Sequence, residues 1–253
     1  MNHSARILPI RVDGLRRADA VDRIFDWLSA SERLGRYVCA ANVHMCMEAK
    51  SNPGFRAVVN GASLVVPDGR PLYWVLRLLR VDQATHIRGS DLMLGICREA
   101  AFRGVPVGLY GGSIESLEGF QAFLSREFPS MQIACAISPP FRPLEDAEDE
   151  EFVECINASG ARILFVGLGC PKQEIWMAAH QNCLNCVMVG IGAAFDFYGG
   201  KKKEAPSWLQ RLGMEWFFRL LNEPNRLWRR YAVYNTMFLL QVMPKAIWSR
   251  LSC

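Results

Sequence analysis

No continuous apolar run of about 18 residues occurs in this 253-residue sequence, so a simple transmembrane helix is not expected. The segment Met1–Asp13 is polar and mixed, and it lacks the basic and apolar regions of a secretory signal peptide. The 9 cysteines are an odd number and lie scattered from Cys39 to Cys253. These features argue against a disulfide scaffold and indicate free thiols in a reducing cytoplasm.

Motifs of several enzyme classes are also missing. Cys183 and Cys186 have no second cysteine pair or nearby histidine, and the 4 histidines show no metal-ligand spacing, which argues against a zinc site. There is no Gly-x-Ser-x-Gly elbow of a serine hydrolase, no Walker A loop and no Asp-x-Asp pair at the end of a strand. The Gly-x-Gly-x-x-Gly pattern is absent too, which counts against a nicotinamide-dependent oxidoreductase of Rossmann type, an alternative that the fold class allows.

Charge is distributed unevenly behind a net value of +4. From Lys201 to Cys253 there are ten lysines and arginines and three acids, a balance of +7, whereas the rest of the chain carries 19 basic and 22 acidic side chains. A basic C-terminal segment indicates an anionic partner, such as a phosphate ligand, anionic lipid or nucleic acid. A basic-tail nucleic-acid-binding protein is therefore a second alternative, but it would need exposed aromatics among the basic residues, and here they fall mainly on apolar faces.

The body of the chain alternates between apolar runs and helical patterns. Apolar runs that indicate buried strands occupy residues 36–41, 63–66, 105–110, 131–137, 162–166 and 187–191. Helical patterns start near residue 44 and occupy residues 90–102, 114–128, 144–158 and 172–180. This alternation predicts an α/β fold with a mostly parallel sheet. Residues 1–203 are expected to form this core, and residues 204–253, which we call the appendage, a separate helical part.

The appendage has no strand pattern. Apolar residues recur at helical spacing from Pro206, and Glu215 and Arg219 belong to a charged ladder with four-residue spacing on the opposite side. A second helix is expected from near Asn225, with Arg226, Arg229 and Arg230 in its first turn and apolar residues almost all round beyond it. Such a helix is buried either in protein or in lipid, and the basic cluster at one end favours a membrane interface. The exposed apolar faces also leave a homo-oligomer open.

Two glycine-rich turns each follow a predicted strand and precede a predicted helix: residues 108–113 and 167–174. Small residues let a ligand approach the backbone, and the next helix points its N-terminal amides there. Ordinary tight turns are the alternative explanation, but two such turns in one chain favour a nucleotide-type ligand in the crevice of a doubly wound sheet. The candidate binding residues in these turns are Gly111, Gly112, Gly167, Gly169 and Lys172.

Polar side chains end two other predicted strands. Asp68 follows the strand at 63–66 and is suited to act as a general base on a hydroxyl, although Pro67-Asp68-Gly69 is also a common turn signal. Asn42 follows the strand at 36–41, and its amide is suited to a hydroxyl-rich ligand. Asp196 lies among glycines and aromatics, where binding a ribose or base and capping a turn are equally good interpretations.

Together these residues resemble the WecG/TagA/CpsF glycosyltransferases, glycosyltransferase family 26. The similarity runs nearly the whole chain in order, and its most specific parts are Gly167–Glu174 and the pattern Glu215-Trp216, Arg219-Leu220, Glu223-Pro224 and Arg226. Further matches are Asn42, Val66–Gly69, Arg88–Leu92, Gly108–Gly112, Ser138–Phe141, Gly190–Phe197 and Ala205–Trp208.

The resemblance implies a bacterial enzyme that transfers a sugar from a UDP-sugar (UDP-glucose, UDP-ManNAc or UDP-ManNAcA type) to a saccharide on a polyprenyl diphosphate, with inversion, in cell-surface polysaccharide or exopolysaccharide biosynthesis. It also implies a Rossmann-like core with helices on both faces, no metal or other cofactor, and an appendage that docks peripherally on the cytoplasmic face of the inner membrane and completes the site. By the same resemblance Asp68 is the catalytic base. The substrate-binding candidates that the matched motifs add are Arg88, Gln173, Glu174, Arg219, Arg226 and Arg229.

The sequence departs from the family pattern at two positions. Ala40 stands where some members have a threonine, so a hydroxyl contact to the substrate is lost there. Glu204 stands before Ala205-Pro206 where many members have a basic residue, and Lys201–Lys203 are expected to substitute for it. These changes affect the donor and the phosphate contacts rather than the reaction class.

Overall fold

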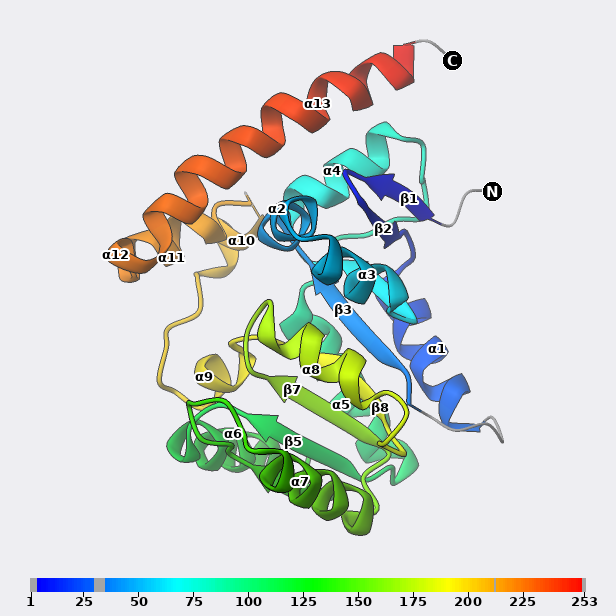
Figure 1. The fold of residues 1–253 in the computed structure, drawn as a ribbon, viewed down its shortest axis with the longest axis vertical. Helices are drawn as coiled ribbons and strands as arrows, with labels where there is room; N and C mark the ends of the chain where they lie inside the picture. Colours follow the sequence, from blue (N-terminus) through cyan, green and yellow to red (C-terminus); the bar gives the residue numbers. More distant parts are fainter. Residues whose placement is uncertain (1–3, 30–34, 212, 252–253) are drawn as a thin grey trace.

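The computed structural model of the chain describes residues 4–29, 35–211 and 213–251. Its centre is a six-stranded sheet in the order β4-β3-β8-β7-β5-β6, with every neighbouring pair parallel (Figure 1). The strands are β3 (Tyr37–Ala41), β4 (Leu64–Pro67), β5 (Val107–Gly111), β6 (Ile133–Ile137), β7 (Ile163–Gly167) and β8 (Val187–Gly190). The α/β fold with a parallel sheet, predicted from the alternating pattern, is confirmed.

Helices cover both faces of this sheet. On one face lie α2 (Val43–Ser51), α3 (Pro53–Gly61), α4 (Arg70–Leu78), α7 (Asp146–Ser159) and α8 (Lys172–His180). On the other face lie α1 (Arg17–Ser29), α5 (Gly89–Arg103), α6 (Ile114–Glu127) and the short α9 (Ala194–Tyr198). Successive strand residues point to opposite faces, so Tyr37 and Cys39 pack in the first cluster while Val38 packs in the second. A strand buried on both faces needs a continuous apolar run, which explains the sequence pattern.

Asparagine caps and a proline set the helix boundaries next to β3. Asn42 caps α2 by accepting a hydrogen bond from the Met45 N–H at 3.2 Å. Pro53 stands in the first turn of α3, which Asn52 caps, so a new helix begins there directly after α2. The sequence analysis did not predict α1, α4 or α9, nor the antiparallel hairpin of β1 (Ser4–Ile7) and β2 (Ile10–Asp13).

The appendage is helical, as expected, but it is divided into more pieces. They are α10 (Ser207–Arg211), α11 (Glu215–Asn222), α12 (Pro224–Arg229), a π-helical stretch η1 (Arg230–Asn235) and α13 (Thr236–Leu251). In Figure 1, α13 crosses above α2 and α4. Its buried residues Phe238, Val242 and Ala246 join the hydrophobic cluster of the first face, whereas Leu240 and Trp248 are exposed. One face of this apolar helix is therefore part of the protein core, and the opposite face is uncovered.

Replacing Phe238 with alanine is expected to loosen α13 from the core. The ring is 0% exposed, and removing a buried phenylalanine costs about 3–5 kcal/mol. Leu240→Ala is the matched control, because Leu240 lies two residues away on the same helix and is 72% exposed. Urea unfolding and limited proteolysis within α13 measure both effects. Equal effects of the two substitutions would contradict the docked position of α13.

Candidate active site

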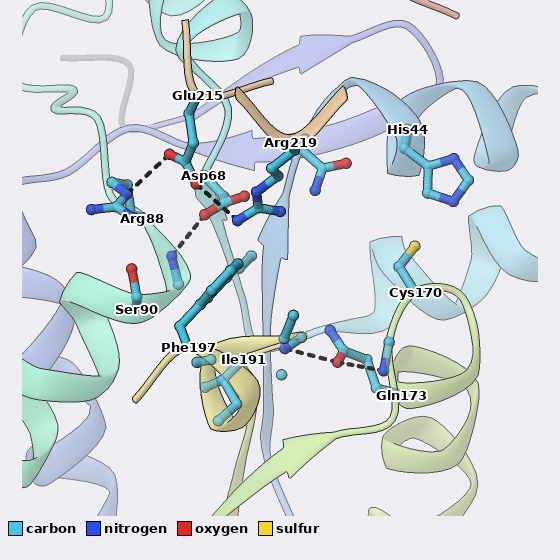
Figure 2. A pocket seen from close by; sticks show the side chains of 18 of the residues that line it. His44, Asp68, Arg88, Ser90, Cys170, Gln173, Ile191, Phe197, Glu215 and Arg219 are labelled. Carbon is cyan, nitrogen blue, oxygen red and sulfur yellow. Dashed lines mark hydrogen bonds and ion pairs between the residues drawn. The ribbon is translucent and has the colours of Figure 1, made fainter. Parts of the chain in front are cut away.

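A cavity of about 660 Å³ opens at the carboxyl ends of β3, β4, β7 and β8, where α11 and η1 of the appendage pass over the core (Figure 2). Among the candidates from the sequence, it brings together Asn42, Asp68, Arg88, Gly169, Gln173, Glu174 and Arg219. Side chains that the sequence analysis did not single out as site residues also line it: His44, Ser90, Phe197, Glu215 and Tyr234.

Asp68 is fixed at the rim of this cavity from two sides. Its Oδ1 accepts a hydrogen bond of 2.7 Å from the N–H of Gly89, the first residue of α5. Its carbonyl oxygen lies 2.5 Å from His86 Nε2, and because a carbonyl only accepts, this nitrogen donates. Burial raises the pKa of the Asp68 carboxyl, the Gly89 N–H lowers it in part, and the negative charge of Glu215 raises it again. A half-buried carboxylate with a raised pKa is suited to accept a proton.

Ion pairs connect the core to the appendage beside Asp68. Arg88, only 8% exposed, pairs with Glu204, and its Nε lies 3.3 Å from Glu215 Oε2. Glu215 Oε1 in turn lies 2.8 Å from Arg219 Nη2. The guanidinium of Arg219 stands over the Phe197 ring, 5.0 Å from its centroid. Both arginines line the cavity and both pair with Glu215, and Arg88 is bound by Glu204 as well.

Gln173 joins the two loops that form the floor of the cavity. Its Oε1 accepts hydrogen bonds from Gly169 N at 3.3 Å, after β7, and from Gly192 N at 3.1 Å, after β8. Its Nε2 donates to Glu174 Oε1 at 2.7 Å. The side chains of Gln173 and Glu174 are both buried. Their observed contacts are with protein groups, and they fix the backbone of the glycine loop after β7. The Asn42 carboxamide oxygen is likewise occupied, by the α2 cap.

Three of the four remaining glycine-turn candidates line a second cavity, of about 430 Å³, at the ends of β5, β6 and β7. Gly112, Gly167 and Lys172 line it, together with a stack in which Trp176 packs on Tyr110 at 4.3 Å. The chain leaves β5 toward β6 and β7 toward β8, in opposite directions, which is where doubly wound sheets form a ligand crevice. Here Gly111 (φ +114°) packs so closely that an added Cβ would lie 2.7 Å from the Gly167 carbonyl.

A third cavity, of about 400 Å³, adjoins the first and shares Ala193, Phe197, Arg219 and Leu227 with it. Lys201, Lys202 and Lys203 line its other side together with Glu223, whose Oε1 lies 3.3 Å from Lys202 Nζ, so its described lining carries more positive than negative charge. Asp196 lies beside this region, where it accepts a hydrogen bond from Ser116 Oγ at 2.8 Å and pairs with Lys202 at 3.2 Å. The backbone of Arg226 and Arg229 belongs to α12, but their side chains lie outside the described residues.

Within the described ranges, no group of three or more His, Cys, Asp or Glu side chains is arranged to hold a metal ion. Nor does any helix in those ranges combine the length and apolar character that crossing a bilayer requires.

Comparison with known proteins agrees with this geometry. The family model described as "Glycosyl transferase WecG/TagA/CpsF family" matches residues 5–252. A protein of Bacillus spizizenii, named N-acetylglucosaminyldiphosphoundecaprenol N-acetyl-beta-D-mannosaminyltransferase, is 31% identical over 197 residues, 78% of this chain and 74% of its own. A Staphylococcus aureus protein of the same name is 28% identical over 228 residues, 90% of this chain and 88% of its own. The resemblance drawn from the sequence motifs is confirmed, and the chain belongs to the WecG/TagA/CpsF family of glycosyl transferases.

Proposed function

We propose that the protein transfers a sugar from a UDP-sugar to a saccharide carried on a polyprenyl diphosphate, with inversion at the anomeric carbon. The names of the relatives narrow the proposal to N-acetylmannosamine as the donor sugar and N-acetylglucosaminyl-diphosphoundecaprenol as the acceptor. The observation that carries it is the position of Asp68, a carboxylate with a raised pKa at the rim of a cavity that also contains Arg219.

In the proposed reaction, Asp68 removes the proton from an acceptor hydroxyl as the hydroxyl oxygen attacks the anomeric carbon. The new glycosidic bond forms on the face opposite the bond to UDP, which breaks with its electron pair on the diphosphate. Attack from the opposite face inverts the configuration, and the proton stays on Asp68. Because UDP leaves as an anion, the site needs positive charge more than a general acid. Arg219 is the described side chain of the cavity best placed to supply it.

The three cavities suggest how the two substrates share the site. We assign the donor nucleotide to the crevice between β5 and β7, where Gly111, Gly112, Gly167 and Lys172 lie. The acceptor diphosphate is assigned to the cation-lined cavity of Lys201–Lys203 and Arg219. Arg226 and Arg229, on the adjoining helix α12, are proposed to bind diphosphate as well. The acceptor sugar is then proposed to meet the donor at Asp68, in the cavity of about 660 Å³ that adjoins the third one.

The appendage, residues 204–253, is proposed to hold the core, residues 1–203, at the cytoplasmic face of the bacterial inner membrane. Exposed large apolar side chains are frequent on it: Trp208, Trp216, Phe217, Leu221, Trp228, Val233, Met237, Leu239, Leu240, Ile247 and Trp248. Apolar surface of this extent together with the basic balance of the segment suits an anionic membrane surface. A peripheral position concentrates the enzyme near an acceptor that is anchored in lipid.

A transfer assay with purified full-length protein tests the proposal. The acceptor is a synthetic GlcNAc-diphospholipid, and the donors are UDP-N-acetylmannosamine, its uronic acid and UDP-glucose. We expect a disaccharide lipid from UDP-N-acetylmannosamine, with the anomeric configuration opposite to that of the donor by NMR. The same lipid without its saccharide is the control. Absence of product from all three donors, with UDP still released at the background rate, would contradict the proposed function.

Transfer is expected to survive an excess of chelator. In the proposed reaction, Arg219 and the lysines of the third cavity supply the positive charge that a divalent ion supplies in other enzymes. The initial rate is compared in EDTA and in added manganese. Strong loss in EDTA that manganese restores would refute the metal-independent account.

A further inference from the structure

Glu215 occupies a central place in the ion pairs beside Asp68. It comes from α11 of the appendage, and its two carboxylate oxygens contact different arginines: Oε2 the Nε of Arg88 at 3.3 Å, and Oε1 the Nη2 of Arg219 at 2.8 Å. Figure 2 shows Glu215 between these two arginines, with the Asp68 carboxylate directly beside them. One side chain thus joins Arg88, the cap residue of the core helix α5, to Arg219 of the appendage, and both arginines line the cavity.

The partners of Arg88 reinforce this connection. Arg88 also contacts Glu204 and, at 2.6 Å, the Gln210 Oε1, both in the appendage, while within the core helix α5 its Nη1 lies 3.6 Å from Asp91 Oδ1. The residue after Arg88 is Gly89, whose N–H binds the Asp68 carboxylate. Arg88 and Gly89 are therefore part of one short segment that both positions the Asp68 carboxylate and binds the appendage.

We propose that Glu215 is a positioning residue of this site. It binds Arg88 of the core and Arg219 of its own helix at the same time, and it thereby holds α11 at a fixed position relative to Asp68. This inference rests on the proposed function, since it assigns Glu215 a role in the same transfer reaction. Glu215 does not exchange a proton with the substrate. It acts through Arg219, whose guanidinium it orients over Phe197, and through its own charge.

The charge of Glu215 acts on Asp68 in a defined direction. Among the described residues, the charged or titratable groups of the two cavities that Asp68 lines are His44 from α2, Arg70 from α4, His86 and Arg88 from the segment before α5, Cys170 just before α8 and Glu174 in its first turn, Glu215 and Arg219 from α11, and Tyr231 and Tyr234 from η1. The pKa of Asp68 is raised mainly by burial, and the negative charge of Glu215 raises it further. Removing that charge lowers the pKa of Asp68 directly, and it also leaves Arg88 and Arg219 less compensated, which acts in the same direction.

Glu215→Gln tests the proposal, because it keeps the shape of the side chain and removes its charge. We expect kcat at neutral pH to fall on the order of 10- to 100-fold, as for a misplaced catalytic group. We also expect the acid limb of the pH profile of kcat/KM to move to lower pH. Glu215→Asp keeps the charge but is too short to reach both arginines, so kcat should fall while the acid limb stays near its wild-type position.

Glu99→Gln is the matched control. Glu99 pairs with Arg103 four residues later at 2.5 Å, and Arg103 stands over the Phe25 ring at 4.9 Å, so the arrangement repeats that of Glu215, Arg219 and Phe197 far from Asp68. This variant is expected to keep both kcat and the pH profile. An acid limb that stays in place in Glu215→Gln, or a kcat equal to that of Glu99→Gln, would overturn the proposal.

The titration of Asp68, followed by carboxyl ¹³C NMR, keeps the test independent of activity. If the wild-type protein transfers no sugar from any donor, the proposed function fails, and the Asp68 titration in wild type and Glu215→Gln still decides the role of Glu215. A lower pKa in the variant supports it, and an unchanged pKa refutes it. If Glu215→Gln does not fold, Glu215→Asp decides instead, since an unchanged kcat in that variant would refute the positioning role.

Discussion

Replacing Asp68 with asparagine is expected to lower the rate of sugar transfer about 10²- to 10⁴-fold, the range that a positioned general base contributes. The amide oxygen of asparagine can still accept the hydrogen bond from Gly89 N–H, so the local structure should persist. The amide cannot take up the proton of the acceptor hydroxyl. UDP binding, measured by calorimetry, is expected to stay near the wild-type value, because the nucleotide is assigned to the crevice between β5 and β7.

Asp13→Asn is the control for this substitution. Asp13 is also a buried carboxylate that accepts a backbone N–H, that of Val65 in β4, at 2.9 Å, but it does not line the cavity. Asp13→Asn should change the free energy of unfolding more than it changes the rate of sugar transfer. Near wild-type turnover of Asp68→Asn would remove Asp68 from the mechanism.

Replacing Arg219 with alanine is expected to have the next largest effect, a loss of about 10²- to 10³-fold in kcat/KM, as when one charge-stabilising donor is removed. Arg219 lines both the cavity of Asp68 and the cation-lined cavity, so its charge lies between the reacting centre and the proposed diphosphate site. Arg219→Lys should recover part of the activity, because a lysine keeps the charge but loses the planar two-point contact.

Arg103→Ala provides the comparison, since Arg103 makes the same type of glutamate pair and ring contact outside the site. Steady-state kinetics with varied acceptor separate an effect on binding from one on turnover. An Arg219→Ala variant that matches Arg103→Ala in kcat/KM would show that Arg219 only stabilises the appendage.

The parts of the fold that could be predicted are those that local pattern determines. Strands buried on both faces have continuous apolar runs, so all six strands of the sheet were predicted to within a few residues. The hairpin of β1 and β2 was missed because its short strands lie in a segment of mixed polarity. The strand order, in which β8 pairs with β3, depends on contacts between residues about 150 positions apart, and local pattern does not encode it.

In the candidate site, too, local pattern predicts some residues, and contacts between distant parts of the chain determine the others. Asp68 and Asn42 could be placed together because the carboxyl ends of parallel strands meet at one edge of the sheet. Lys172 and Gln173 are adjacent in the sequence, yet Lys172 lines the second cavity and Gln173 the first, because successive helix residues point about 100° apart. Glu215 was taken as part of a charged ladder on α11, and only the fold reveals that Arg88, more than 120 residues earlier, lies against it.

Membership in a glycosyl transferase family also decides between the alternatives that the composition allowed. A nicotinamide-dependent oxidoreductase and a nucleic-acid-binding protein both fitted a chain with an α/β core and a basic tail. The basic residues Lys201–Lys203 and Arg219 line a cavity of about 400 Å³ rather than a flat surface, which suits a small anionic group.

The most direct test of a base at Asp68 is the pH dependence of transfer by the wild-type enzyme. A general base works in its deprotonated form, so the rate should fall as the pH is lowered through the pKa of its carboxyl. Because burial raises that pKa, the fall is expected to have its midpoint above about 3.9, the ordinary value for aspartate. A transfer rate that stays constant down to that ordinary value, in protein shown to remain folded, would contradict the account.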